Sequence, residues 1–234
     1  MQICPVCFWE DAPGEAPWNS SNGVSLLEAQ MNFVEFGASE REFLDAVRPA
    51  TSDEPLDPAW LNFEDQAEAI IQLIEASFAD VTLGEGMTIH QREVVDDRGS
   101  QKEFDDARQW DTEQRWQDIR DSKIMHLGTT LTFLDDESIR YHLPAFMRCV
   151  LRQWLEAKKI NHEMILHSLA DGPKSPDYYA DAFTLLNPGQ KQATAAFLKF
   201  LSLTDFRYGD EAERGLRRGW ADFLHTPTPI PFFP

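Results

Sequence analysis

The clearest candidates for chemistry are two thiols near the N-terminus, in the run Cys4-Pro5-Val6-Cys7. Two thiolates separated by two residues can bind one zinc ion, but a closed tetrahedral site needs four ligands and usually a second pair. The chain has only one further cysteine, Cys149. Redox catalysis is disfavoured, because the motif precedes a proline-rich loop and has no basic neighbour to lower a thiol pKa. Two interpretations stay open: zinc bound by Cys4 and Cys7 with ligands from elsewhere, or two reduced thiols.

A second candidate is a polar patch made of Asp135, Asp136, Arg140 and His142. Carboxylates at a turn can bind a hard cation or act in general acid–base catalysis if a cleft raises a pKa. Turns also favour Asp simply for local hydrogen bonds. Apolar residues alternate on both sides of this turn, a period of two that predicts a β-hairpin at about residues 130–143: Leu131, Phe133, Ile139, Tyr141 and Leu143. A functional patch and a solvated hairpin are both compatible with this pattern.

The third candidate is a concentration of acidic side chains. Residues 1–80 contain 16 Asp and Glu against two Arg, a net charge of −14 out of −19 for the whole chain. Such a field repels nucleic acid and anionic membranes and attracts cationic partners. We predict that five carboxylates share one face of two helices and bind a basic protein: Glu28, Glu35, Glu64, Glu68 and Glu75. The alternative is that the charge serves solubility alone.

Helical patterns must position most of these side chains. A capping box of Ser25 and Glu28 predicts a helix that ends at Gly37, and an Asn62 cap begins the clearest apolar stripe, at residues 62–78. Other helices are predicted from a Ser39/Glu42 box through Val47, from Pro144 to about Leu155, from Asn187-Pro188 to about Leu201, and over roughly 210–224. The predicted fold class is therefore mainly α with a small β-hairpin, an α+β protein.

The chain divides by composition into four parts. We assign residues 1–49 to a cysteine-containing acidic segment, 50–60 to a Pro-rich linker, 61–225 to a helical domain, and 226–234 to a Pro-rich extended tail. The N-terminal segment is expected to pack on the helical domain or to be tethered to it. No run of about 18 apolar residues and no signal peptide is present, and three cysteines are too few for a disulfide scaffold. A cytoplasmic location is the expectation.

The segment from Cys4 to about Pro49 resembles the bacterial cysteine-rich CPCC domain. The matching stretches are Cys4-Pro5-Val6-Cys7-Phe8-Trp9-Glu10-Asp11, Ser25-Leu26-Leu27-Glu28-Ala29, Asn32-Phe33 and Glu35-Phe36-Gly37-Ala38-Ser39-Glu40. The resemblance implies a small zinc-ribbon-like module. The family's upstream CPCC cluster would lie before Met1, so only half of the implied ligands are present.

Residues from about 63 to 203 resemble a second bacterial family, a domain of unknown function. The similar stretches are Phe133-Leu134-Asp135-Asp136-Glu137, Ile139-Arg140-Tyr141-His142-Leu143-Pro144-Ala145-Phe146-Met147, Leu185-Leu186-Asn187-Pro188-Gly189-Gln190 and Phe197-Leu198-Lys199-Phe200-Leu201. This resemblance implies no activity.

Three functions follow as hypotheses. The preferred one is a non-enzymatic acidic protein that binds a basic protein partner, for example an immunity protein or antitoxin. The second is an enzyme with a polar pocket near residues 135–142, although no phosphate-binding, dinucleotide or Ser/His/Asp motif is present. The third is a zinc-dependent structural adaptor, in which Cys4 and Cys7 join a second chain.

Overall fold

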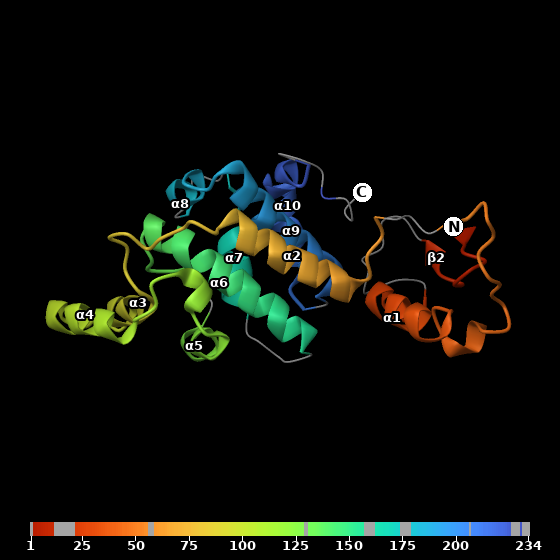
Figure 1. Ribbon diagram of the computed structural model, residues 1–234, viewed down its shortest axis with the longest axis horizontal. Coiled ribbons are helices and arrows are strands. Elements are labelled where there is room, and N and C mark those ends of the chain that lie inside the picture. The colour runs from red at the N-terminus through yellow and green to blue at the C-terminus, as the bar shows by residue number, and fades with distance from the viewer. Residues whose placement is uncertain are drawn as a thin grey trace.

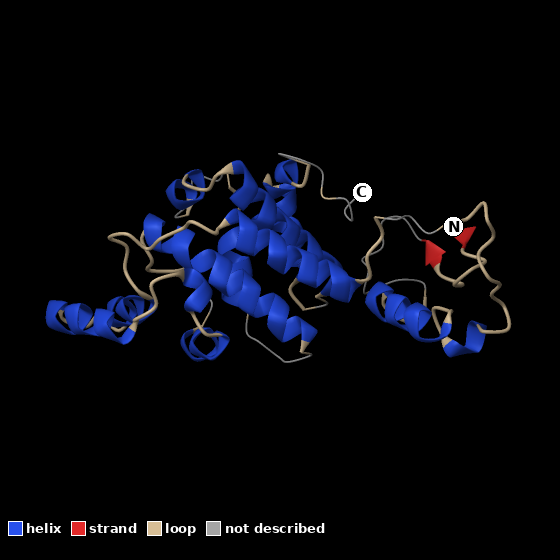
Figure 2. Ribbon diagram, viewed as in Figure 1, coloured by secondary structure: helices blue, strands red, loops and turns tan. Residues whose placement is uncertain are grey.

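A computed structural model describes residues 2–11, 22–55, 59–128, 131–156, 162–173, 179–205, 207–225 and 230. Helices dominate these residues, and the strands are limited to one short pair (Figure 2). The strands are β1 (Gln2–Ile3) and β2 (Glu10–Asp11), and the α-helices are α1 (Leu26–Phe36), α2 (Phe63–Ser77), α3 (Ile89–Asp96), α4 (Gln101–Ala107), α5 (Asp121–Leu127), α6 (Asp136–Leu155), α7 (Glu163–Ala170), α8 (Ala180–Thr184), α9 (Pro188–Thr204) and α10 (Gly209–Arg217). Four 3-10 helices complete the list: η1 (Arg41–Phe43), η2 (Arg108–Trp110), η3 (Trp116–Asp118) and η4 (Trp220–Phe223).

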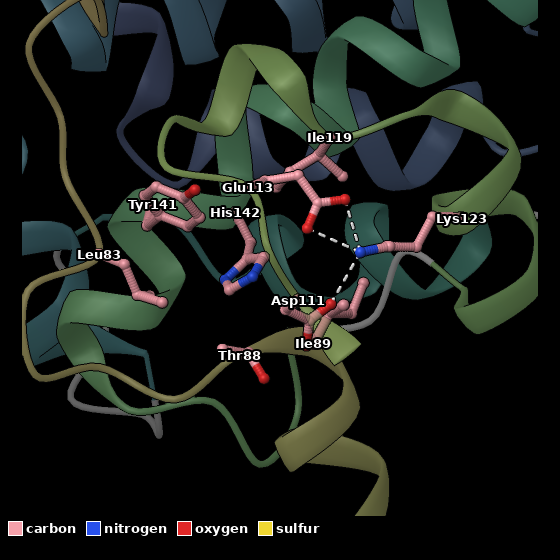
Figure 3. A pocket seen from close by; sticks show the side chains of 9 residues that line it. All are labelled: Leu83, Thr88, Ile89, Asp111, Glu113, Ile119, Lys123, Tyr141 and His142. Atoms are coloured by element: carbon pink, nitrogen blue, oxygen red, sulfur yellow. Dashed lines mark hydrogen bonds and ion pairs between the residues drawn. The ribbon is translucent and has the colours of Figure 1, made fainter. Parts of the chain in front are cut away.

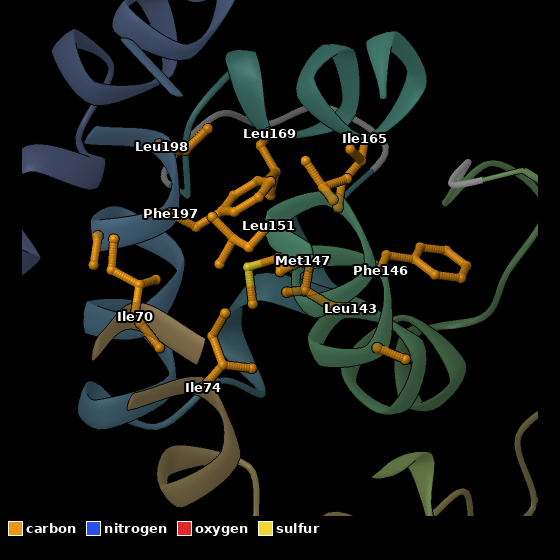
Figure 4. Packing of buried hydrophobic residues seen from close by; sticks show 14 of the residues in the cluster. Ile70, Ile74, Leu143, Phe146, Met147, Leu151, Ile165, Leu169, Phe197 and Leu198 are labelled. Carbon is orange, nitrogen blue, oxygen red and sulfur yellow. The ribbon is translucent and has the colours of Figure 1, made fainter. Parts of the chain in front are cut away.

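The hydrophobic core surrounds α6. Helix α2 packs on both α6 and α9, and α10 packs on α7 and α9. Side chains from α2, α6, α7 and α9 meet in one cluster, including Ile70, Met147, Leu169 and Phe197 (Figure 4). Every side chain from residue 141 to residue 151 is buried, so α6 is enclosed on all sides over three turns.

The N-terminal region lies at one end of the molecule, and α3 and α4 lie at the other (Figure 1). Strands β1 and β2 pair antiparallel, with Ile3 opposite Glu10. Helix α1 contacts α9, and Leu26 and Leu27 reach the main core. The region is thus attached to the helical domain through the start of α1.

The helix starts predicted at Ser25, Asn62 and Asn187 are confirmed. The Ser25 hydroxyl accepts from the Glu28 N–H, and Gly37 ends α1 at a φ of 89°. The Asn62 side chain caps α2, and Asn187 forms a capping box at the start of α9. The prediction of a helix that begins with a Ser39/Glu42 box is wrong: the 3-10 helix η1 follows instead, and the Ser39 hydroxyl has no hydrogen-bond partner among the described residues.

The predicted hairpin at 130–143 is also wrong. Asp135 is the N-cap of α6, and the helix continues through Leu155 with Pro144 in its interior. The misleading signal was apolar residues at every second position. In a helix enclosed on all sides almost every position is apolar, so the period of 3.6 is lost and alternating positions can mimic a strand. Phe133, expected on a buried strand face, is exposed at a φ of 68°.

The predicted Pro-rich tail, 226–234, lies outside the described residues except for Ile230, which is buried against the core. Within the part of the chain that the structure describes, none of the helices combines the length and apolar character needed to cross a bilayer.

Candidate functional site

The Cys4–Cys7 motif forms a tight turn between β1 and β2. The Phe8 N–H donates to the Cys4 carbonyl and the Cys4 N–H to the Trp9 carbonyl, both at 2.8 Å. Phe8 closes the turn at a φ of 65°, which non-glycine residues rarely adopt. The Cys7 carbonyl accepts from the Ser39 N–H at 2.6 Å. These backbone bonds hold both thiols on one side of the turn, next to each other.

The two thiols differ in acidity. Burial raises the pKa of Cys4, but hydrogen bonds from the backbone N–H groups of Cys7 and Val6 and from the Cys7 thiol outweigh it, so the Cys4 pKa is lowered. The pKa of Cys7 is raised, by burial first and by its thiol neighbour second. Of the two thiols, Cys4 is therefore the one that loses its proton first.

A zinc ion would need more than these two ligands. Among the residues described, no group of three His, Cys, Asp or Glu side chains is arranged to hold a metal ion. The described chain therefore supplies Cys4 and Cys7 alone, half of a tetrahedral zinc set. A complete site would need donors from a second chain or from outside the described residues.

The predicted polar patch does not form as expected. Asp135 is the helix cap: its carboxylate accepts from the Ser138 N–H at 2.9 Å and from the Met87 N–H at 3.1 Å. Asp136 lies in the first turn of α6, where burial, Asp181 and Asp135 raise its pKa. Two positions along a helix are about 200° apart, so Arg140 and His142 point in different directions instead of sharing a strand face.

His142 is instead part of the protein interior. Its Nδ1 lies 2.8 Å from the Ser138 carbonyl oxygen, so Nδ1 carries the proton. Burial lowers the pKa of His142 to about 4. The imidazole is therefore neutral near pH 7.

A polar cluster that the sequence did not predict lies beside His142 (Figure 3). The Lys123 ammonium lies 2.9 Å from Asp111 Oδ1 and 2.6 Å from Glu113 Oε1. His90 Nδ1 contacts the same Asp111 oxygen at 2.8 Å. The Asp111 side chain is only 8% exposed. The charged side chains of Asp111, Glu113 and Lys123 are therefore largely internal.

The electrostatics of this cluster are those of a stable ion pair. Burial raises the pKa of Asp111, but hydrogen bonds from Thr88, Lys123 and His90 outweigh it and lower the pKa. Burial lowers the pKa of Lys123, but Glu113 and Asp111 reverse the effect and raise it. Both groups are fully charged at neutral pH, which leaves neither a free base nor a free amine nucleophile.

The space beside the cluster is small. His142 and Tyr141 from α6 border it together with the ion pairs, and its volume is about 20 Å³. That is room for about one water molecule. The cluster therefore joins α3, α5 and α6 and has no room for a substrate.

The five predicted carboxylates have different surroundings. Glu35 is exposed and pairs with Arg41 at 2.9 Å, and Glu75 lies 3.7 Å from both Arg148 and Arg152. Three are exposed with no ion pair to any described residue: Glu28, Glu64 and Glu68. Glu28 is in the first turn of α1, and Glu64 and Glu68 are in the first two turns of α2. We call these three the free carboxylates. The helices that carry them, α1 and α2, lie next to each other where the N-terminal region meets the helical domain (Figure 1).

Comparison with known proteins gives the family of the chain. Residues 65–222, about two thirds of the sequence, match the model of a family of unknown function, DUF6714. The protein therefore belongs to this family. Residues 1–54 match the model of the cysteine-rich CPCC family. Both resemblances expected from the sequence are confirmed. Among curated proteins and among solved structures, no significant match was found.

Proposed function

We propose that the protein is a non-enzymatic binding protein, and that its acidic N-terminal third binds a basic protein partner. An inhibitor of a basic toxin, such as an immunity protein or antitoxin, is the concrete form of the proposal. The observation that carries the proposal is how the only two basic side chains in residues 1–80, Arg41 and Arg48, are paired. Arg41 pairs with Glu35 and Arg48 with Glu54, so neither neutralises any other carboxylate of this third.

Apart from Glu75, which lies near Arg148 and Arg152, the exposed carboxylates of this third that have no ion pair to a described residue are available for an external cation. Exposed acidic side chains without an ion pair to a described residue include the free carboxylates Glu28, Glu64 and Glu68 and also Glu42, Asp45, Asp53, Asp65 and Asp80. A concentration of like charge on one part of a surface raises the rate of association with a partner of opposite charge. The small volume beside the Asp111–Lys123 pair supports a binding function over catalysis there.

The test is a comparison of two triple charge reversals. One variant carries Glu28→Lys, Glu64→Lys and Glu68→Lys. The matched control carries Glu85→Lys, Asp97→Lys and Asp105→Lys, three exposed carboxylates outside the acidic third. Both variants change the net charge equally, so only the position of the charge differs.

The partner is first captured from the native host with the immobilised wild-type chain and then purified. We expect the association rate with the purified partner to fall at least tenfold in the first variant and much less in the control. The wild-type rate should fall as salt rises from 0.01 M to 0.15 M, because the Debye length shrinks from about 30 Å to about 8 Å. Equal losses in the two variants, or capture of no basic protein, would refute the proposal.

A second candidate function, a zinc-dependent adaptor, is supported by the turn at Cys4 and Cys7. Backbone N–H groups donate to the Cys4 sulfur and favour the thiolate that zinc requires. In this proposal two chains each contribute Cys4 and Cys7 to one ion. We expect one zinc per two chains and a dimer that EDTA dissociates. Free alkylation of both thiols in metal-replete protein would exclude it.

A further inference from the structure

We infer that the basic partner docks with an amphipathic helix along the outer face of α1. This inference rests on the proposed function and names the element of the partner that binds. The inner face of α1 packs within the protein: Ala29 is buried, and Phe33 lies beside Trp60. The outer face is open to solvent, since Met31 and Val34 are 52% and 60% exposed.

Apolar residues on the outer face follow the spacing of a helix–helix contact. Leu27, Met31 and Val34 are separated by four and then three residues, which places them at successive d, a and d positions of a heptad. We call these three residues the α1 seam. Leu27 packs against the main core, and the other two continue the row into solvent. A single exposed apolar side chain is common, whereas a row at heptad spacing is what a second helix buries.

Charge identifies the kind of helix that fits the α1 seam. Glu28 and Glu35 directly follow the two d positions, so both occupy e positions beside the seam. Glu35 pairs with Arg41 at 2.9 Å, but both side chains are largely exposed, so a cation of the partner can replace Arg41 at little cost. Charges at e and g positions select the partner in a helix pair. A helix with Lys or Arg beside its apolar row is therefore favoured.

The same charges disfavour a second copy of the chain at this face. A second copy would bring its own Glu28 and Glu35 to the α1 seam, and each chain carries a net charge of −19. Juxtaposed like charges weaken association. The occupant that fits both the apolar row and the carboxylates is thus a basic amphipathic helix.

The experiment measures binding of three labelled helical peptides, each of about three heptads, to the full chain by fluorescence anisotropy. The first peptide has Leu at a and d and Lys at e and g. The second has Glu in place of the Lys, and the third keeps the Lys but has Ala at a and d. Lys at both e and g makes the first peptide repel itself, which keeps it monomeric. We expect the first peptide to bind about tenfold tighter, or more, than either of the others.

A pair of double variants tests the apolar row. Met31→Ala with Val34→Ala, the seam variant, removes the exposed part of the row and introduces a strong helix former, so the chain should stay folded. Its affinity for the first peptide should fall about tenfold. Val95→Ala with Met164→Ala truncates exposed apolar side chains on α3 and α7. This control should bind the first peptide like wild type.

Reversal of the flanking charges tests the direction of the attraction. Glu28→Lys with Glu35→Lys should exchange the preference, so that the peptide with Glu binds tighter than the first peptide. Absence of saturable binding of the first peptide, or equal losses in the seam variant and the control, would overturn the inference. Self-association of the wild-type chain that the seam variant abolishes would also overturn it, because the face would then belong to a second copy.

The proposed function is judged by a separate measurement, the capture of a native basic protein and the effect of the charge reversals on its association rate. A native partner that passes this test while the first peptide does not bind would leave the proposed function in place and refute the helical docking mode. If the first peptide binds as expected and the native host yields no basic protein, the proposed function fails instead.

Discussion

In the N-terminal region, residues 2–55, only Ala29, Ala38 and Ser39 are buried among the described side chains whose exposure is defined. In the helical domain, eleven consecutive residues of α6 are buried, from 141 to 151. The first region is held by backbone hydrogen bonds and surface ion pairs, the second by a continuous apolar core. Regions with few buried apolar contacts open most easily and often carry binding surfaces. The comparison assigns stability to the helical domain and supports the proposal that the N-terminal region carries recognition.

The largest change in the free energy of unfolding is expected when an aromatic side chain is removed from the core of the helical domain. Phe146 is fully buried in α6, so Phe146→Ala should lower the free energy of unfolding by about 3–5 kcal/mol. Phe43, which stacks on Phe8 at the surface of the N-terminal region, is the matched control. Phe43→Ala should leave the main urea transition within about 1 kcal/mol of wild type. Equal losses would show that the two regions unfold as one unit.

Low pH should destabilise the helical domain through protonation of His142 in the unfolded state. Its pKa is about 4 in the folded chain, below the value near 6.5 of an unfolded histidine. At pH 7 both states are neutral and the group contributes nothing. As the pH falls below 6.5 the unfolded state binds a proton that the folded state does not, so stability decreases until about pH 4, by roughly 3 kcal/mol in total.

The measurement is urea unfolding at pH 7 and pH 4.5. His142→Gln should lose less stability between these values than wild type does. His126→Gln, which alters an exposed histidine, should behave like wild type. If His142→Gln and His126→Gln respond to acid equally, His142 is not the acid-sensitive group.

A smaller effect comes from two helix caps, one in each region. Asp135→Ala removes the cap of α6 and the bond to the Met87 N–H, and should lower the global stability by about 1–2 kcal/mol. Ser25→Ala removes the cap of α1 and should destabilise only the N-terminal region. Hydrogen exchange of α1 amides should report this local change, while the urea transition stays in place. A shift of the urea unfolding transition in Ser25→Ala would instead show that α1 unfolds together with the core.

The smallest expected effect on stability is that of the charge reversals. Glu28, Glu64 and Glu68 are exposed and have no ion pair with a described residue, so each reversal to Lys should change stability by less than about 1 kcal/mol, mainly through the helix dipole. Thermal unfolding of the triple variant should stay close to that of wild type. A large drop would mean that these carboxylates stabilise the fold, and the assignment of recognition to them would fail.

Local features of the structure were predictable from the sequence. The caps at Ser25, Asn62 and Asn187 each involve a residue three positions away. Both partners of each interaction can therefore be recognised in the local sequence. Helix α2 buries only one face, so its apolar residues form a single stripe whose period of 3.6 residues is visible in the sequence. The match of two families to two parts of the chain likewise needed only sequence.

The tertiary structure decided what depends on contacts between distant segments. The second half of α6 was predicted as a helix from Pro144, but its first part alternates in the sequence like a strand, and the surroundings that bury residues 141–151 on all sides decide for a continuous helix. Asp111 and Lys123 look like surface charges in the sequence, and only the arrangement of α3, α5 and α6 makes them a buried pair. Ser39 lies three residues before Glu42, the spacing of a helix cap, yet its backbone N–H donates to the Cys7 carbonyl and its buried hydroxyl has no hydrogen-bond partner among the described residues. In each case the deciding partner is distant in the chain, and no local pattern can encode it.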